Sequence, residues 1–154
     1  MSHHTARIAW SRNDGDFPAR RYSREHTWTF DGGLTVPASA SPSNVPLPFS
    51  NPALVDPEEA FVAAISSCHM LWFLALAAEQ GFIVEHYIDD AVGVLVHERG
   101  GKSWISTVTL VPRITYGGTR HPSDHEEDEL HHLAHDKCFI ANSVRTVITV
   151  QRPA

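Results

Sequence analysis

A run of apolar residues near the middle of the chain constrains the fold more than any other feature of the sequence. The run begins with Asp56, a favoured N-cap, and Pro57, which suits the first helical position. Glu58 and Glu59 follow, and Glu59 stands where a capping box requires it. Gly81, a favoured residue just after a helix, sets the end of the run. Because the residues between these limits leave no continuous polar stripe, the pattern predicts a long central helix enclosed by other elements.

Strand-like segments lie on both sides of this helix. Segments 5–10 and 22–30 precede it and are followed by turn residues. Segments 88–97 and 104–116 are rich in Val, Ile and Thr and are joined by a turn with two glycines, which predicts a long β-hairpin. Segment 144–151 alternates between apolar and polar residues and is expected to be the final strand. With a second helix before that strand, the order of elements predicts an α+β fold.

That second helix is predicted from a capping box. Ser123 and Glu126 have the required spacing, and the acidic, histidine-rich segment that follows extends to about Lys137. A further short helical stretch is expected at 138–143.

Six of the ten prolines lie in the segment 37–57. Proline has no backbone donor and disfavours a helical conformation in the residue before it. The segment is therefore predicted to be an extended loop, and loops of this length are usually functional or cover a partner surface.

Length and charge exclude several classes of protein. At 154 residues the chain has the length of one domain, and a single domain over residues 1–154 is expected. The 12 Lys and Arg against 18 Asp and Glu give a net charge of −6, which disfavours binding to nucleic acid. The strongest apolar stretch, 70–78, is shorter than the ~20 residues that cross a bilayer, and the N-terminus lacks the pattern of a secretion signal. We expect a cytoplasmic protein that spans no membrane.

The two cysteines, Cys68 and Cys138, are too few for a disulfide scaffold and do not have the spacing of a paired zinc-finger motif. For each cysteine alone, three interpretations stay open: an inert core thiol, a metal ligand, or redox chemistry.

Eleven histidines are the other unusual feature of the composition. His131, His135 and Cys138 would share one face of the second helix, which is a spacing that zinc ligands use, and a solvated polar face is the commoner meaning of such a pattern. His69 follows Cys68 directly and either shapes a pocket or packs in the core.

The segment 56–68, DPEEAFVAAISSC, resembles the Asn-Pro-Glu-Glu helix of the OsmC/Ohr family, the osmotically inducible and organic hydroperoxide resistance proteins. Cys138 in the second helical region and the order of elements extend the resemblance over nearly the whole chain. His69 and Phe139 depart from it, because the family usually has Phe and Pro at these positions. The resemblance implies an OsmC-like fold, with antiparallel sheets wrapped around a long central helix, and an intertwined homodimer with sites at the interface.

The resemblance further implies a thiol peroxidase that uses no cofactor and no metal. Cys68 would attack an organic hydroperoxide and become a sulfenic acid while the alcohol leaves. Cys138 would then condense with Cys68 to form an intramolecular disulfide, and a dithiol reductant of lipoyl or similar type would restore both thiols.

A peroxidatic cysteine has to be a thiolate, and in the family an arginine lowers its pKa. The candidates are Arg20, Arg21 and Arg24. Arg24 is favoured because, in the predicted strand, it would share a face with His26 and Trp28. Glu58 would orient that arginine through a bidentate pair, or would act as a first-turn acid that complements the helix dipole.

The spacing between Glu58 and Cys68 limits how the site is assembled. Ten residues of straight helix correspond to ~15 Å of rise, so the two side chains cannot meet on one unbroken helix. Either the helix bends near Ser66 and Ser67, or a second subunit completes the site.

Apolar residues around Cys68 are expected to favour a bulky organic hydroperoxide over hydrogen peroxide. The candidate pocket walls are Phe61, Met70, Trp72, Phe73 and Phe139, and the same residues also fit a core. Two other functions remain as alternatives: a non-enzymatic redox-sensing or ligand-binding stress protein of the same fold, and a metal-binding protein that uses the histidine-rich helix.

Overall fold

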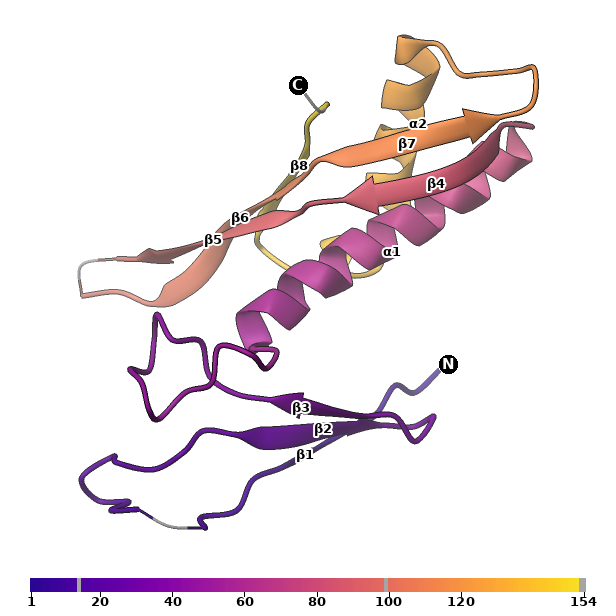
Figure 1. Ribbon diagram of the computed structural model, residues 1–154. Helices are drawn as coiled ribbons and strands as arrows, with labels where there is room; N and C mark the ends of the chain where they lie inside the picture. Colours follow the sequence, from indigo (N-terminus) through magenta and orange to yellow (C-terminus); the bar gives the residue numbers. More distant parts are fainter. Residues whose placement is uncertain (14, 99, 153–154) are drawn as a thin grey trace. The chain divides into compact units, whose positions relative to one another are not determined.

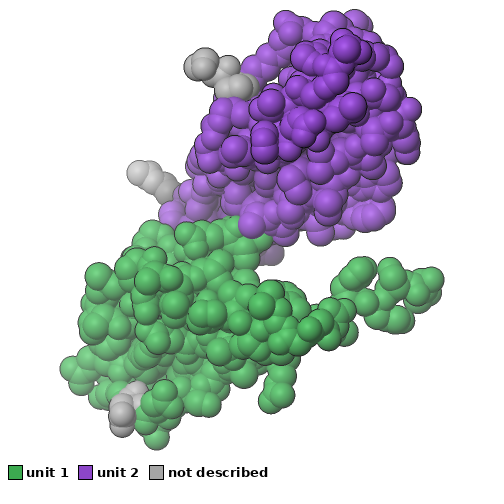
Figure 2. Space-filling view, turned by 45° about the vertical axis from the view of Figure 1, so that its right-hand side comes forward, with its two compact units in different colours: residues 1–60 green, residues 61–154 purple. Residues whose placement is uncertain are grey.

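The computed structural model describes residues 1–13, 15–98 and 100–152 (Figure 1). The chain divides into two compact units, residues 1–60 and residues 61–154, which Figure 2 draws in green and purple. We call them the first unit and the second unit. The single-domain organisation expected from the length stays a prediction.

The first unit holds a three-stranded antiparallel sheet in the order β1-β2-β3. Its strands are β1 (Ala6–Ala9), β2 (His26–Phe30) and β3 (Thr35–Ala38). Gly33, at φ 85°, makes the tight turn between β2 and β3, in a conformation that residues with a side chain rarely adopt. The strands predicted at 5–10 and 22–30 are confirmed in shorter form, whereas β3 is absent from the sequence prediction.

The proline-rich loop predicted at 37–57 is shorter than expected and is cross-linked by hydrogen bonds. Its first residues belong to β3, where Pro37 lies opposite Thr27 at the edge of the sheet. Further along, the Ser39 N–H donates to the Val55 carbonyl oxygen at 3.0 Å, and the Ser39 hydroxyl accepts from the Asn51 N–H at 3.0 Å. Because Ser39 is fully buried, this segment packs against the sheet rather than extending freely.

Helix α1 (Pro57–Glu79) confirms the predicted central helix (Figure 1). The Glu59 N–H donates to Asp56 Oδ1 at 2.8 Å, and the Asp56 N–H donates to Glu59 Oε2 at 3.1 Å, so the predicted capping box is present. Gly81, at φ 79°, follows the end of the helix as expected of a helix stop.

Only one face of α1 is covered within the second unit. Its buried residues are Ile65, His69, Phe73, Leu76 and Ala77. On the opposite face the Leu71 side chain is 62% exposed. The prediction of a helix enclosed on all sides is therefore wrong for the single chain. The polar stripe is missing because α1 carries small and apolar residues on an exposed face as well.

By length and composition alone, the 23 residues of α1 also fit a membrane-spanning helix. Core helices of globular proteins meet the same criterion. In the second unit, the inner face of α1 packs through Phe73 and Leu76 into a cluster of buried side chains, which is the arrangement of a core helix.

The second unit contains two small sheets. The strands β4 (Ile83–Asp89) and β7 (Pro112–Gly117) form an antiparallel pair. The strands β5 (Val92–His97), β6 (Ser103–Leu110) and β8 (Val147–Val150) form the other sheet, in which β5 is antiparallel and β8 parallel to β6. The predicted hairpin is confirmed for β5 and β6, and the predicted final strand is confirmed in β8.

The strands predicted at 88–97 and 104–116 are each divided in two. The first breaks after Asp89 and the second at Val111, and the two breaks face each other: Asp89 Oδ1 accepts a hydrogen bond from the Val111 N–H at 2.7 Å. The side chain thus takes the place of a ladder partner where both strands leave one sheet for the other. In addition, β4 begins earlier than predicted, at Ile83.

Helix α2 (Asp124–Lys137) confirms the second predicted helix. Ser123 is its N-cap and forms the predicted capping box with Glu126, and Cys138 is its C-cap. The helical stretch predicted at 138–143 is reduced to the short 3₁₀ helix η1 (Ala141–Ser143).

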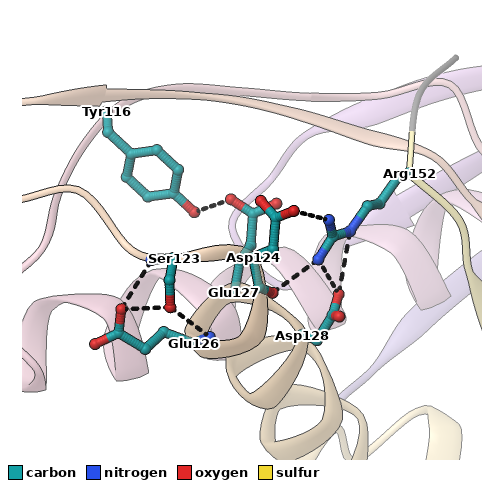
Figure 3. A network of polar contacts seen from close by, with 7 residues as sticks. All are labelled: Tyr116, Ser123, Asp124, Glu126, Glu127, Asp128 and Arg152. Atoms are coloured by element: carbon teal, nitrogen blue, oxygen red, sulfur yellow. Dashed lines mark hydrogen bonds and ion pairs between the residues drawn. The ribbon is translucent and has the colours of Figure 1, made fainter.

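A network of polar contacts fixes the beginning of α2 (Figure 3). Arg152 contacts the carboxylates of Asp124 and Asp128 at 2.8 Å and 2.9 Å. The Tyr116 hydroxyl of β7 donates to Glu127 at 2.7 Å. The chain that follows β8 and the strand β7 are thereby tied to the first turns of α2.

Two clusters of buried side chains form the core of the second unit. The larger joins α1 to α2 and consists of Phe73, Leu76, Ala77, Phe82, Leu130 and Ala134. The smaller joins α1 to β6 and consists of Ile65, Val108 and Leu110. The predicted α+β class is confirmed, and the inner face of α1 is held between α2 and the sheets.

Candidate active site

The fold brings the two cysteines together within the second unit. Cys68 lies on the outer face of α1, and Cys138 is the C-cap of α2. The two thiols lie close enough for Cys68 to raise the pKa of Cys138, and neither cysteine forms a disulfide. Of the three interpretations open to each cysteine alone, this proximity favours redox chemistry.

Cys138 and Cys68 differ in exposure. Cys138 is fully buried, whereas Cys68 is partly exposed. Burial raises the pKa of the Cys138 thiol, and its hydrogen bond with Cys68 raises the pKa further. The Ala141 N–H, which donates to Cys138 Sγ at 3.3 Å, acts in the opposite direction without reversing the shift. Cys138 is therefore a protonated thiol near neutral pH, and Cys68 is the more accessible of the two thiols.

An apolar groove of about 520 Å³ lies beside Cys68. Its walls come from the outer face of α1 and from the segment after α2, and they include Ala64, Leu71, Trp72, Ala75, Phe139 and Ile140. Of the predicted pocket walls, Trp72 and Phe139 line this groove. Phe73 belongs to the core, and Phe61 lines a separate groove with Trp104.

Arg24 and Glu58, both in the first unit, have other partners than the predicted pair. The Arg24 guanidinium donates to the carbonyl oxygens of Arg20 and Tyr22 and stacks 3.7 Å from the centre of the Tyr22 ring. Glu58 Oε1 accepts from the Asn44 amide at 2.9 Å. The parity argument for Arg24 is wrong, because β2 begins only at His26 and Arg24 precedes the strand.

The other candidate arginines also lie in the first unit. Arg21 contacts the Asp16 carboxylate at 3.3 Å. Arg20 has φ 60°, a left-handed conformation that is unusual for a residue with a side chain.

A buried pair of histidines is the feature of the second unit that sequence reasoning missed. His69 Nε2 and His131 Nδ1 lie 3.0 Å apart, and the two residues are 1% and 8% exposed. Burial lowers the pKa of each histidine to about 4, and in His131 the neighbouring His69 lowers it further. Both rings are neutral near pH 7, and the N–H of one ring donates a hydrogen bond to the ring nitrogen of the other. Of the two interpretations of His69, the packed core histidine is correct.

The zinc site considered for the second helix does not form. Among the described residues, no group of three or more His, Cys, Asp or Glu side chains is arranged to hold a metal ion. His131 Nδ1 is engaged by His69, and Cys138 by Cys68, so the predicted helical face is divided between two other contacts.

Comparisons with known proteins identify the family and the fold. The family model described as OsmC-like protein matches residues 50–152. The structure is similar to that of an OsmC-like protein of unknown function from Vibrio cholerae O1, with 51% sequence identity, a TM-score of 0.95, and coverage of 99% of this chain and 100% of that chain. A search among curated proteins gives no match.

More distant structures share the fold alone. An organic hydroperoxide resistance protein from Legionella pneumophila is 18% identical with a TM-score of 0.70, over 99% of this chain and 96% of that chain. Another from Elizabethkingia anophelis is 17% identical with a TM-score of 0.72, over 99% and 98%. The predicted OsmC-like fold is confirmed.

Proposed function

The chain belongs to the OsmC-like family, and from that premise we propose that it is a cysteine-dependent peroxidase that reduces organic hydroperoxides to alcohols. The observation that carries the proposal is that the fold brings Cys68 of α1 close to Cys138 at the end of α2, although 69 residues separate them in the sequence. Two thiols that lie close together can form a disulfide after a limited movement. Organic hydroperoxide resistance proteins of the same fold support the same role.

The proposed reaction has three steps. The Cys68 thiolate attacks the terminal oxygen of the hydroperoxide, the O–O bond breaks, and the organic oxygen leaves and takes up a proton to give the alcohol. Cys68 is then a sulfenic acid. The Cys138 sulfur attacks the Cys68 sulfur, the disulfide forms, and the hydroxyl group leaves as water with the Cys138 proton. A dithiol reductant of lipoyl or similar type reduces the disulfide and is itself oxidised to a disulfide.

The groove supports an organic rather than an inorganic peroxide. Its walls are mainly aliphatic and aromatic, so it offers hydrogen peroxide few hydrogen-bond partners but gives an organic group apolar contact beside Cys68. The partly exposed Cys68 and the buried Cys138 match the roles of attacking and resolving cysteine.

Activation of Cys68 is proposed to come from Arg24, with Glu58 as its orienting carboxylate. Both side chains would exchange their present partners, which are backbone carbonyls for Arg24 and Asn44 for Glu58. Arg20 is the alternative, since its left-handed backbone is a strain of the kind that functional residues carry. Arg24→Gln and Arg20→Gln variants distinguish the two: the activating arginine is the one whose loss shifts the pH dependence of Cys68 alkylation upward.

A second copy of the chain is the proposed partner in a homodimer. In the second unit, Leu71 is 62% exposed, and β4, β5 and β8 carry further exposed Ile and Val side chains. Apolar surface of this extent commonly marks an interface. Sedimentation at micromolar concentration should give a dimer, and an active monomer would contradict this part of the proposal. The proposed compartment is the cytoplasm, where dithiol reductants keep such a pair reduced.

The test of the function has two parts: consumption of an organic hydroperoxide in the presence of a dithiol and, in a separate sample without the dithiol, the intact mass of the protein before and after a single addition of peroxide. The wild-type protein should lose about 2 Da through one disulfide. A Cys138→Ser variant should instead gain about 16 Da, because the sulfenic acid of Cys68 has no partner. Absence of both mass changes in the folded protein would refute the proposal.

The alternative is a redox-sensing protein of the same fold. The raised pKa of Cys138 favours it, because a protonated thiol attacks the sulfenic acid slowly. Stoichiometric oxidation to the disulfide with no turnover under any dithiol would select the sensor.

A further inference from the structure

Two aromatic rings form one corner of the groove beside Cys68. Trp72 lies four residues after Cys68, one helical turn further on the same face of α1. Phe139 follows Cys138 directly. The two ring centres are 5.5 Å apart and their planes meet at 86°, an edge-to-face arrangement.

The two rings are held differently. Trp72 packs against the core cluster of α1 and α2, and the Lys137 ammonium lies 5.4 Å from the centre of its ring. Phe139, in contrast, is 69% exposed and contributes little to the core. An exposed phenylalanine at the mouth of a groove therefore leaves a ring surface free for another group.

The residues that line the groove indicate which kind of ligand could bind there. Cys68 and Ser67 are its polar members, and the lining has no charged side chain. A ligand is therefore expected to be neutral where it enters the groove. An edge-to-face pair accepts a third ring readily, because rings prefer offset or edge contacts with one another.

We propose that Phe139, with Trp72, makes this protein selective for aryl hydroperoxides, in which an aromatic ring lies one or two bonds from the O–O group. This inference rests on the proposed peroxidase function and names its substrate class. The ring of the substrate lies against Phe139 and Trp72 while its terminal oxygen meets Cys68 Sγ. The O–O bond breaks as described above, and the product is the corresponding aryl-substituted alcohol.

The test compares cumene hydroperoxide, which has a ring, with tert-butyl hydroperoxide, which has none, in wild type and Phe139→Leu. The change to leucine keeps an apolar side chain and removes the ring. The ratio of kcat/KM for the two peroxides should fall about 2- to 13-fold, the range expected for one aromatic contact. Because this contact exists before and during the reaction, the fall should appear in KM for cumene hydroperoxide rather than in kcat.

The matched control is Phe30→Leu, which removes an exposed phenylalanine from the end of β2 in the first unit. It should leave the ratio unchanged. If Phe139→Leu lowers kcat/KM equally for both peroxides, or if the wild type does not prefer the aryl substrate, the inference is overturned while the peroxidase function stands.

A binding measurement separates failure of the inference from failure of the function. Cumyl alcohol, the unreactive product, is titrated into Cys68→Ser protein and followed by tryptophan fluorescence. It should bind more tightly than tert-butanol, and the additional change Phe139→Leu should weaken binding of cumyl alcohol about 2- to 13-fold. Equal binding with and without the Phe139 ring would refute the inference, whatever the peroxidase assay gives.

Discussion

Helix α1 carries a titratable side chain on each of two faces, one buried in the core and the other beside an open groove. His69 and Cys68 are neighbours in the sequence, yet they point about 100° apart around the helix. His69 lies on the inner face, fully enclosed, with its Nε2 hydrogen-bonded to His131 Nδ1. Cys68 lies on the outer face beside an open groove, with its thiol close to Cys138.

The difference between the faces separates stability from reactivity. On the inner face, burial keeps two titratable rings neutral and holds α1 against α2. On the outer face, exposure lets a substrate approach the Cys68 thiol. Because this side chain makes few packing contacts, its substitution should cost little stability. Substitutions one residue apart should therefore affect different properties of the protein.

The largest expected effect on activity is that of Cys68→Ser. Serine keeps the size of the side chain but is a poor nucleophile at neutral pH, so hydroperoxide turnover should fall on the order of 10³-fold or more. The free energy of unfolding, measured in urea, should change by less than about 0.5 kcal/mol, because Cys68 is not part of the core. Retention of a tenth of the activity would assign the attack to Cys138 instead.

The converse substitution on the inner face is His69→Ala. It opens a cavity and leaves His131 Nδ1 buried without a partner, so the free energy of unfolding should fall by about 3 to 5 kcal/mol. Turnover per folded molecule should stay close to that of the wild type. His132→Ala on α2, where the histidine is largely exposed, is the control and should cost less than about 0.5 kcal/mol. A loss below 1 kcal/mol in His69→Ala would show that the pair is not a stabilising contact.

The histidine pair also predicts a dependence of stability on pH. Each pKa is lowered from 6.5 to about 4 in the folded protein, so the unfolded chain takes up protons first as the pH falls. The contribution of the pair to the free energy of unfolding should therefore be fully present above pH 6.5 and should be lost as the pH falls from 6.5 to 4. Below pH 4 this contribution should change little. For one histidine the loss is about 3 kcal/mol.

The groups that face the pair set the background of this titration. His135 and Asp89 act on His69, and Asp128 and Arg152 act on His131. Urea unfolding of the wild type and of a double variant, His69→Leu with His131→Leu, across pH 4 to 7 isolates the contribution of the pair. The double variant should have a flatter profile, and identical slopes would contradict the assignment.

Local signals predicted the ends of the helices, whereas contacts between distant segments could not be predicted. Asp56, Ser123 and Gly81 act on neighbouring backbone groups, so their spacing alone located α1 and the start of α2. The hydrogen bond between Asp89 and Val111 lies where the two predicted strands are each divided, so that four strands are observed. It joins segments that only the folded sheet brings together.

The candidate site divides in the same way. The family resemblance led to Cys68 and Cys138, which lie close together, because their motif is local and specific. It led to Arg24 only through an assumed strand, and that strand begins two residues later. The partner of His69 lies on the other helix, and a histidine-rich segment offers several equivalent candidates, so periodicity could not select His131.

The smallest predicted effect concerns the start of α2, away from both faces of α1. Ser123 Oγ accepts from the Glu126 N–H at 3.3 Å, and Glu126 Oε2 accepts from the Ser123 N–H at 2.8 Å, a bond that lowers the pKa of Glu126. Ser123→Ala removes half of this capping box and should lower the free energy of unfolding by about 1 kcal/mol, measured from the urea midpoint. Because Cys138 lies at the other end of α2, about 21 Å along the helix axis, peroxide-driven formation of the disulfide should keep its wild-type rate. A slower rate would mean that the capped end of α2 also positions the resolving cysteine, so that stability and reactivity, separate on α1, are coupled on α2.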